Sequence, residues 1–580
     1  MNATVLQCPS LVSVVRRRAL NAPDKLCCTF LYNDIEHHMT YGQLDKRARA
    51  IASTLQYYGA QPGDRILLLF SSGLSLIQAF FGCLYAGCIA VPVYPPLNKK
   101  PLEKTQRIIN NAKPRFALMT AEQILDFAVL DKKNTPHFAR IPCIAIDAVN
   151  EKWAEHWDMV AIHQYSVAFL QYTSGSTMHP KGVIINHRNL VDNIDKILSA
   201  FDLNEHCVLL TWLPPHHSTG LIGSILTPIY GGVPIIMMTP ESFLHQPVLW
   251  LKNITKYKVT ISSSPNFGYD YCVKQIKEKD KIGLDLTTWS VAINSSEPVR
   301  LETMEHFYEG FKECGFNKKT FYPCYGLSEA TLLVTGGTPG RPYRTLTIAK
   351  KEYRDHRVHF VKETGADTYT LVSSGKMIQK IRIVDPETLM PCDQDQIGEI
   401  WIHGESVAQG YWQNNDQTEF AFQATINGEA SNIRYLRTGD LGFIHAAELY
   451  VTGRIHDLIK LYGKNHYPQD IEYTLLHDPL HAWLGHCAVF LCQEHNEYNL
   501  TLLCEVDESF IDPNRQTELF NSIFELIYQV HQLELHTIVL IPLKSMPHTA
   551  NGTIRRSICQ KRLIDKSLPV IARWEINAIT

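Results

Sequence analysis

The chain has 580 residues, of which 45% are apolar and 19% charged, and its formal net charge is −3. This length exceeds what a single hydrophobic core fills, so we expect at least two domains. The ordinary composition excludes long disordered tails, and the near balance of acidic and basic residues gives no basis for nucleic-acid binding.

The cysteines and the N-terminal residues indicate the compartment. The fifteen cysteines show neither the paired spacing of zinc ligands nor a disulfide framework. Residues 1–20 lack the charged-then-apolar order of a signal peptide. We therefore predict a cytoplasmic protein in a reducing setting, without structural zinc.

Residues 66–98 form the first long uncharged stretch, and it is long enough to span a membrane. Ser71–Gly73 and the proline-rich run 91–96 interrupt it, which favours a strand, a helix and a second strand instead. A second uncharged stretch, residues 207–240, is broken by proline and glycine pairs, so we predict no membrane span. The elements predicted in the first stretch are Ile66–Phe70, Leu74–Tyr85 and Cys88–Val93.

Further along the chain, short β-branched runs alternate with segments of helical period. Such alternation is typical of α/β layers around buried sheets. From about residue 350 short strands follow one another, which predicts a β-rich subdomain, and the tail after Asp457 is long enough for a small α+β domain. We place the domain boundary between residues 1–455 and 456–580. The predicted strands are Val167–Tyr172, Gly182–Ile185, Pro234–Met238, Val259–Ser262, Met377–Val384, Gly398–His403 and Leu449–Thr452.

The segment Tyr172–Gly182 is a Ser/Thr/Gly loop that follows a predicted strand. Hydroxyls and backbone N–H groups at such a position suit a triphosphate, and Lys181 adds a positive charge. The loop is not a P-loop of the GxxxxGK[ST] kind, because Pro180 replaces the second glycine. Alone, the pattern also fits a solvated turn. The candidate phosphate-binding residues are Thr173, Ser174, Gly175, Ser176, Thr177 and Lys181.

The loop resembles the phosphate-binding signature of the adenylate-forming superfamily, which includes acyl-CoA synthetases, luciferases and peptide-synthetase adenylation domains. Three further motifs follow in the superfamily's order, namely YGLSEAT at Tyr325–Thr331, YLRTGDLG at Tyr435–Gly442 and GRIHDLIK at Gly453–Lys460. The resemblance implies an α/β fold, with a large adenylation domain of two α/β subdomains plus a β-rich subdomain. It also implies that the small C-terminal α+β domain is mobile.

Four other segments are similar to fatty acyl-AMP ligases: Trp212–Gly223, Ser264–Asp270, Asn294–Arg300 and Tyr467–Glu472. An extra segment around Arg344–Thr370 matches an insertion that is typical of these ligases. The resemblance implies that ATP and Mg²⁺ are used to convert a medium- or long-chain fatty acid to its acyl-AMP. The acyl group would then pass to the phosphopantetheine arm of an acyl carrier protein. We expect a monomer.

The resemblance assigns the reacting centre to residues near Tyr325. Glu329 would bind Mg²⁺ together with phosphate oxygens. Tyr325 would stack on adenine and Ser328 would meet the α-phosphate. The structural alternatives are a helix-capping carboxylate at 329 and an ordinary core tyrosine at 325.

The ribose is assigned to Asp440 and Arg454. A carboxylate accepts hydrogen bonds from two hydroxyls, and Arg454 would hold the ribose or a phosphate from the other side. Alternatively, these two residues and Arg437 form a surface ion-pair set of little stabilising value. The other nucleotide-binding candidates are Ser296, Glu297, Pro298 and Gly326.

The resemblance places His217 between the phosphate site and the acyl tunnel, where we count it as catalytic, although a lone histidine is usually an ordinary core or surface residue. Asp457 would be the hinge about which the C-terminal domain rotates. The acyl-binding candidates are Gly220, Ser264, Pro265, Asn266 and Phe267.

Two positions depart from the family pattern. Thr553 stands where the superfamily has a catalytic lysine, and the loss of that charge would slow adenylation by about 10²-fold or more. The alternatives are that Arg555 or Lys544 replaces the lysine, or that Mg²⁺ and the phosphate loop alone support the first step. His217–Gly220 replaces the HDMG run of the ligases. A degenerate binding protein and an acyl-CoA synthetase therefore stay open as alternatives. An amino-acid-activating domain ranks last, because Ser262–Gly268 offers no acidic partner for an amine.

Overall fold

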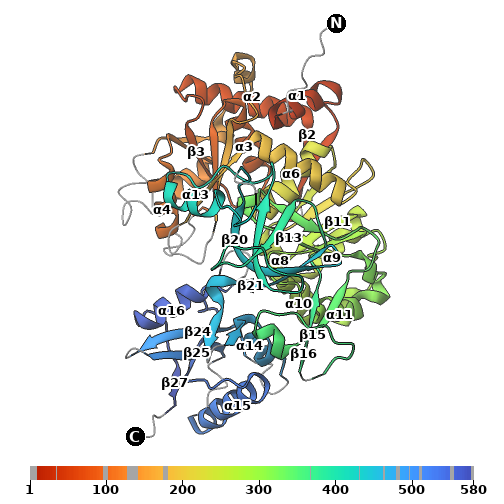
Figure 1. The fold of residues 1–580 in the computed structure, drawn as a ribbon. Helices are drawn as coiled ribbons and strands as arrows, with labels where there is room; N and C mark the ends of the chain where they lie inside the picture. Colours follow the sequence, from red (N-terminus) through yellow and green to blue (C-terminus); the bar gives the residue numbers. More distant parts are fainter. Residues whose placement is uncertain are drawn as a thin grey trace.

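The computed structural model describes residues 10–33, 35–95, 102–126, 141–173, 180–365, 367–429, 432–461, 464–478, 484–494, 497–507, 513–548 and 554–576. Figure 1 shows the N-terminal segments at the top, the middle of the chain in a second sheet-rich layer, and the C-terminal segments as a separate lobe below. Within the described ranges, no helix combines the length and apolar character needed to cross a membrane.

A six-stranded sheet forms the upper layer, in the order β6-β5-β3-β4-β7-β8. Its strands are parallel except for the β7–β8 pair, which is antiparallel. The predicted strand, helix and strand between residues 66 and 98 are confirmed, and helix α3 has the predicted bounds. The elements are β3 (Arg65–Leu69), α3 (Leu74–Tyr85), β4 (Ile89–Val93), α4 (Leu102–Ala112), β5 (Phe116–Met119), β6 (Cys143–Ala145), β7 (Val167–Tyr172) and β8 (Gly182–Asn186).

The second sheet has 13 strands, in the order β18-β19-β20-β21-β17-β14-β13-β12-β11-β9-β10-β1-β2. The run from β13 to β1 is parallel, and the strands on either side of it pair antiparallel. The predicted β-rich region is present, and its strands extend this same sheet because β14 pairs with β13. The strands are β1 (Leu26–Tyr32), β2 (Ile35–Thr40), β9 (Leu209–Thr211), β10 (Ile235–Met237), β11 (Ile261–Ser264), β12 (Val291–Asn294), β13 (Phe321–Gly326), β14 (Leu333–Gly336), β17 (Lys376–Met377), β18 (Lys380–Val384), β19 (Gly398–His403), β20 (Leu436–His445) and β21 (Glu448–Arg454).

Helices pack between and around these two sheets. The largest hydrophobic cluster joins residues of both sheets to buried side chains such as Phe80, Phe81 and Ile194. Such contacts exclude water from a large apolar area, which is the main favourable term in folding. The helices are α1 (Leu11–Asn21), α2 (Tyr41–Tyr57), α6 (His187–Ala200), α7 (Thr227–Gly231), α8 (Pro240–His245), α9 (Val248–Tyr257), α10 (Asn266–Gln275), α11 (Leu301–Phe311) and α13 (Asn415–Phe422).

A layer of aromatic side chains lies under α8 to α11. Trp212 stacks on Phe243 with ring centroids 3.9 Å apart, and Trp250 meets Trp289 edge to face at 5.2 Å. The Tyr269 ring contacts both the Trp250 ring and the Trp289 ring. These offset and edge-to-face geometries are the arrangements that aromatic rings prefer.

The C-terminal lobe has its own four-stranded sheet, in the order β24-β25-β26-β27. Its core includes Leu502, Ile523, Ile527 and Leu540, all fully buried. The predicted small α+β domain at the C-terminus is confirmed. Its elements are β22 (Ile459–Leu461), β23 (Lys464–His466), α14 (Pro468–His477), β24 (Cys487–Glu494), β25 (Glu497–Val506), α15 (Pro513–His531), β26 (Thr537–Pro542), α16 (Arg556–Ile564) and β27 (Ala572–Glu575).

The extra segment predicted around Arg344–Thr370 folds into a hairpin with a short helix, composed of β15 (Thr345–Ala349), α12 (Lys350–Arg354) and β16 (Thr368–Val372). Tyr353 stacks on Tyr467 of the C-terminal part at 4.7 Å. The Asn465 side chain also donates to the Arg354 carbonyl at 3.0 Å. The hairpin thus packs against the C-terminal lobe, and both lie at the lower end of the molecule in Figure 1.

Candidate active site

The predicted phosphate loop joins β7 to β8. Thr173 N donates to the Lys181 carbonyl at 3.1 Å and closes the base of the loop. The ammonium group of Lys181 lies 4.8 Å from the centre of the Tyr411 ring. The Tyr411 hydroxyl in turn donates to Glu329 Oε1 at 2.9 Å. The structure therefore brings the base of the loop and Glu329 together. The loop candidates Ser174, Gly175, Ser176 and Thr177 lie outside the described residues.

Glu329 sits in a single helical turn, Ser328–Ala330, which follows β13. Its carbonyl accepts a hydrogen bond from Ala408 N at 2.9 Å. Gly326 is the last residue of β13, two residues before this turn, and a Cβ there would lie 1.8 Å from the Leu332 carbonyl oxygen. Only glycine fits at that position, so the local backbone packing explains why the YGLSE motif has a glycine there.

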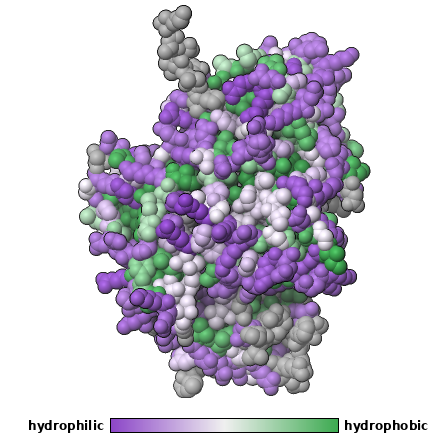
Figure 2. All heavy atoms as spheres, turned by 90° about the vertical axis from the view of Figure 1, so that its right-hand side faces the viewer, coloured by the Kyte–Doolittle hydropathy of each residue, from purple (hydrophilic) through white to green (hydrophobic). Residues whose placement is uncertain are grey.

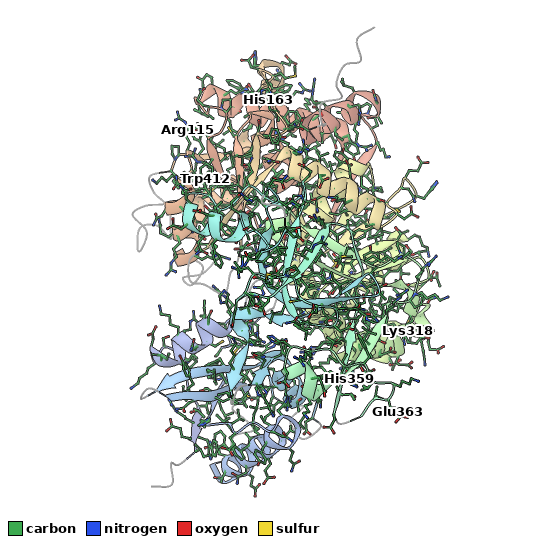
Figure 3. All side chains as sticks on the ribbon, viewed as in Figure 1. Arg115, His163, Lys318, His359, Glu363 and Trp412 are labelled. Atoms are coloured by element: carbon green, nitrogen blue, oxygen red, sulfur yellow. The ribbon has the colours of Figure 1, made fainter. Side chains whose placement is uncertain are left out.

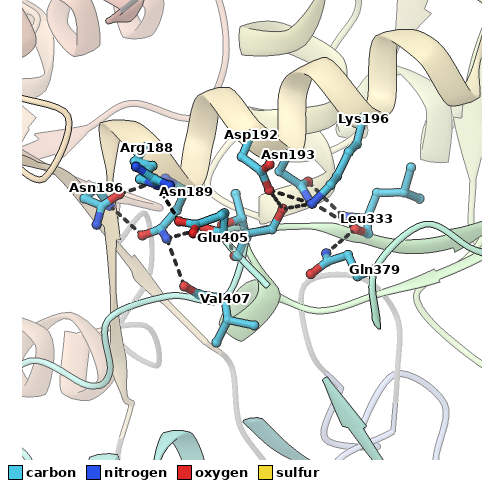
Figure 4. A network of polar contacts seen from close by, with 12 residues as sticks. Asn186, Arg188, Asn189, Asp192, Asn193, Lys196, Leu333, Gln379, Glu405 and Val407 are labelled. Atoms are coloured by element: carbon cyan, nitrogen blue, oxygen red, sulfur yellow. Dashed lines mark hydrogen bonds and ion pairs between the residues drawn. The ribbon is translucent and has the colours of Figure 1, made fainter. Parts of the chain in front are cut away.

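Side chains of helix α6 hold two backbone segments, one at residues 405–407 and one at Leu333, as Figure 4 shows. The Asn189 side chain donates to the carbonyls of Glu405 and Val407 at 2.7 and 2.9 Å. The Asn193 amide exchanges two 3.0 Å hydrogen bonds with the backbone of Leu333. Buried amides satisfied in this way hold backbone segments at defined positions.

Tyr325, Asp440 and Arg454 form a compact group. Asp440 Oδ2 accepts from the Tyr325 hydroxyl at 2.8 Å, and Asp440 Oδ1 pairs with Arg454 Nε at 3.0 Å. The group exists because Asp440 and Arg454 face each other in the β20–β21 register. Arg437 does not join it, since it pairs with Glu399 at 2.8 Å, so the three-member ion-pair set is not formed.

The segment that follows β12 carries the remaining nucleotide candidates. Ser296 has a φ of +76°, a left-handed conformation that is uncommon for a serine. Burial raises the pKa of Glu297 to about 7, against the lowering effect of a hydrogen bond from the Phe267 N–H. That bond is 3.2 Å long, and the Asn266 amide donates to the Pro298 carbonyl at 2.6 Å. Segments 264–267 and 296–298 are thus tied together.

A cavity opens between β11, β12, β13 and the π-helix Thr219–Leu226. Its apolar lining includes Phe201, Leu209 and Leu333. Tyr325 and Ser296 also line it, so it borders the nucleotide candidates.

The five predicted acyl-binding residues lie next to this cavity without lining it. Gly220 approaches the Pro214 carbonyl so closely that a Cβ would lie 2.2 Å from the oxygen. Ser264 donates its hydroxyl to the carbonyl of Pro265 at 2.8 Å, and Asn266 and Phe267 contact residues 297 and 298 as described above. The lining comes from adjacent positions, Thr219, Gly223 and Ile261–Ser263. The five assignments stay predictions.

His217 precedes the π-helix and is half-buried. Burial, followed by the positive charge of Lys104, lowers the pKa of His217 to about 3, so the imidazole is neutral. Within the described part of the chain its Nε2 has no hydrogen-bond partner. The next residue, Ser218, contacts Ser328 at 3.2 Å between the two hydroxyl oxygens. His217 therefore lies beside the reacting centre that the motifs predict.

The predicted hinge, Asp457, pairs with Arg556 at 3.1 Å, and Arg556 also pairs with Glu472. Thr553 lies outside the described residues. The sequence analysis missed Tyr411, which contacts both Lys181 and Glu329, because no local pattern around this aromatic residue marks it.

Comparisons with known proteins place the chain in a family. The AMP-binding enzyme family matches residues 15–412, and the Disco-interacting protein 2-like AMP domain matches residues 456–573. A solved fatty acid AMP ligase from Legionella pneumophila is 60% identical, with a TM-score of 0.77 and 99% of each chain covered. A medium-chain-fatty-acid–[acyl-carrier-protein] ligase, JamA of Moorena producens, is 35% identical over 98% of this chain and 96% of its own length.

The fold and these matches define the class, which is that of adenylate-forming enzymes. The chain belongs to the AMP-binding enzyme family, in its branch of fatty acyl-AMP ligases. The family prediction made from the motifs is therefore confirmed.

Proposed function

We propose that the enzyme uses ATP to convert a medium- or long-chain fatty acid to acyl-AMP and then transfers the acyl group to the phosphopantetheine thiol of an acyl carrier protein. In the first step a carboxylate oxygen bonds to the α-phosphorus and pyrophosphate leaves with the electron pair of the broken P–O bond. The observation that carries this proposal is the position of Tyr325 between the nucleotide candidates and the apolar cavity. Its hydroxyl contacts Asp440, while its side chain borders the apolar cavity.

The nucleotide would lie across the carboxyl ends of the parallel strands, the edge at which open α/β sheets bind ligands. Asp440 accepts two hydrogen bonds already, and its two oxygens retain lone pairs for the ribose hydroxyls. Lys181 and the loop from Thr173 to Thr177 would bind the phosphates, with Ser328 at the α-phosphate. Ser296 to Pro298 and Gly326 would border the adenine.

Mg²⁺ is part of the proposal, and Glu329 fits it. One Glu329 oxygen accepts from Tyr411, and among the described residues no side-chain hydrogen bond or ion pair reaches the other oxygen, which would bind the cation. Mg²⁺ commonly binds through one carboxylate together with phosphate oxygens and water. Bound there, the ion would neutralise phosphate charge beside Lys181.

The cavity suits the tail of an acyl chain because Phe201, Leu209 and Leu333 give it apolar walls. Gly220 and residues 264–267 would form an outer wall near the carboxylate, with His217 beside the phosphate. After adenylation the domain of residues 456–580 would rotate about Asp457 against residues 1–455.

The acyl carrier protein is proposed over CoA as acceptor because JamA is named as an acyl-carrier-protein ligase. A cytoplasmic location and a monomeric state belong to the same proposal. One face of the molecule, shown in Figure 2, is largely hydrophilic with smaller apolar patches between the polar side chains.

Mass spectrometry of the purified protein with ATP, Mg²⁺, CoA, a phosphopantetheinylated carrier protein and a panel of fatty acids tests the proposal. We expect acyl-AMP and acylated carrier protein without acyl-CoA. Formation of acyl-CoA would instead assign the enzyme to the synthetases. Absence of every product with all acids would contradict the proposal and favour a binding protein.

A further inference from the structure

One serine in the wall of the apolar cavity is buried with its hydroxyl unused. Ser263 belongs to β11, which borders the cavity together with β12 and β13. Figure 3 shows the side chains of this middle layer closely packed, with Lys318 at its edge. Only 5% of Ser263 is exposed, and the residue lines the cavity. Its hydroxyl forms no hydrogen bond with any residue that the structure describes.

The alternation of side chains along β11 directs Ser263 into the cavity. Successive side chains of a strand point to opposite faces of the sheet. The preceding residue, Ser262, points to the other face, where its hydroxyl accepts from Trp250 Nε1 at 2.8 Å and donates to the Leu210 carbonyl at 2.7 Å. Ser263 therefore points to the cavity face, beside Ile293, its partner in the β11–β12 register.

Two other serines in the cavity wall already have partners within the protein. Ser224 donates its hydroxyl to the Thr219 carbonyl at 3.1 Å, and Ser295 forms a side-chain hydrogen bond with Cys324. A buried hydroxyl without a partner is unfavourable, because it has lost its hydrogen bonds to water. Ser263 is therefore a group whose burial calls for a ligand that forms a hydrogen bond with it.

The depth of Ser263 indicates which part of an acyl chain it meets. Ser295 directly precedes the nucleotide candidates of residues 296–298 and also lines the cavity. By the β11–β12 register, Ser263 lies two residues deeper than Ser295, which is about 7 Å along the strands. Ile261 and Leu209, which are paired in register, lie two residues deeper again and are apolar. Ser263 is thus the polar position between the mouth and the apolar end of the cavity.

We propose that Ser263 binds a hydroxyl group carried by the acyl chain, so that the preferred substrate is a hydroxy fatty acid. This inference rests on the proposed function and names its substrate class more narrowly. Two hydroxyls are complementary, because each is able to donate and to accept a hydrogen bond. The substrate hydroxyl lies on a carbon just inside the mouth, and the apolar walls at Ile261 and Leu209 hold the rest of the chain.

Single-turnover acyl-AMP formation and calorimetric titration of the full chain test this specificity. The probes are straight-chain acids of one length, either unsubstituted or with one hydroxyl at successive positions along the chain. We compare wild type with Ser263→Ala, which removes the hydroxyl without adding bulk. The matched control is Ser224→Ala, because Ser224 lines the same cavity but its hydroxyl is bonded within the protein.

Wild type should convert one hydroxy acid about tenfold faster than the unsubstituted acid, the value of one hydrogen bond to a buried group. The advantage should disappear when the hydroxyl is moved toward the carboxylate or the chain end. Ser263→Ala should abolish the preference without slowing conversion of the unsubstituted acid, while Ser224→Ala should retain it. Without ligand, Ser263→Ala should unfold no earlier than wild type, since no internal hydrogen bond is lost.

The proposal is overturned if wild type converts the unsubstituted acid as well as every hydroxy acid, or if Ser263→Ala keeps the preference. A lower unfolding temperature of Ser263→Ala would also contradict it, because the serine would then have a structural partner. Failure of the proposed function gives a different result, since titration requires no turnover. In that case a hydroxy acid binds with a preference that depends on Ser263, yet no acid yields acyl-AMP.

Discussion

At the scale of single residues, Asp440 holds the centre of the candidate site through its contacts with Tyr325 and Arg454. Asp440→Asn keeps the shape but removes the charge and one set of acceptors. We expect acyl-AMP formation to fall by about 10²-fold or more, because each charged hydrogen bond to the ribose is stronger than a neutral one. Quantified acyl-AMP in single-turnover reactions measures this.

The control for that change is Asp416→Asn, because Asp416 is an exposed carboxylate in the first turn of α13. It should form acyl-AMP at the wild-type rate. Full activity of the Asp440 variant would contradict the assignment of Asp440 to nucleotide binding.

Glu297 makes stability depend on pH. Its folded pKa of about 7 lies above the ordinary value of 4.5, so the folded protein binds an extra proton between these limits. This stabilisation is complete below about pH 4.5 and is lost as the pH rises through about 7. Glu297→Gln should therefore lose less stability than wild type between pH 5 and pH 8, by roughly 1–3 kcal/mol.

Denaturant unfolding at the two pH values measures the Glu297 effect. Glutamine keeps an oxygen to accept the Phe267 N–H, so the comparison isolates the charge. If the stability of the two proteins changed equally with pH, the Glu297 carboxyl would be ionised in the folded protein without a loss of stability.

Motifs predicted many of these residues before the structure placed them. Tyr325, Asp440 and Arg454 were predicted as neighbours of one nucleotide, and they are in contact. Tyr411 was not predicted, because its contact with Glu329 joins positions 82 apart and no pattern around it is unusual.

At the scale of elements, the π-helix Thr219–Leu226 depends on Gly220. A methyl group at this position would overlap the carbonyl of Pro214, which belongs to rigid backbone. Gly220→Ala should lower the free energy of unfolding by about 1–3 kcal/mol, the usual cost of overpacking. A shift of the urea midpoint, with the slope unchanged, measures it.

The neighbouring Gly223 is a useful comparison for Gly220. Its Cβ would meet a leucine methyl at 3.0 Å, and that flexible end is able to move. Gly223→Ala should therefore cost less stability. An equal loss of unfolding free energy in the two variants would mean that the backbone at Pro214 moves as easily as the leucine side chain.

Apolar periodicity predicted single elements well and their pairing poorly. The helix Leu74–Tyr85 and the strand Gly398–His403 have the predicted bounds. The region predicted as one strand from Met377 to Val384 is two short strands, β17 and β18, which lie at different places in the sheet. Pairing depends on contacts between distant segments, and local periodicity does not contain that information.

At the scale of the whole molecule, Arg556 joins the predicted hinge to the C-terminal lobe, because it pairs with both Asp457 and Glu472. Arg556→Met leaves two carboxylates without their partner inside a largely buried site. We expect a loss of about 3–5 kcal/mol in the stability of the C-terminal lobe. Hydrogen exchange should rise in residues 456–576 and stay unchanged in the two upper layers.

Arg573→Met serves as the control, since its pair with Glu575 lies at the half-exposed end of the lobe and such pairs contribute little. If Arg556→Met raised exchange throughout the molecule, the C-terminal lobe would not be an independent unit. The boundary near residue 455 would then need revision.

The aromatic layer under α8 to α11 has an optical consequence. Trp212, Trp250 and Trp289 lie close enough to pass excitation energy among themselves, so their emission behaves as one signal from the middle of the chain. Trp574, in β27, lies in the other lobe. Because the chain has nine tryptophans, a variant that keeps only Trp212, Trp250 and Trp289 is needed to read this signal alone. In that variant an emission change on adding a fatty acid would report on the layer beside the cavity, and movement of the C-terminal lobe would leave the emission unchanged.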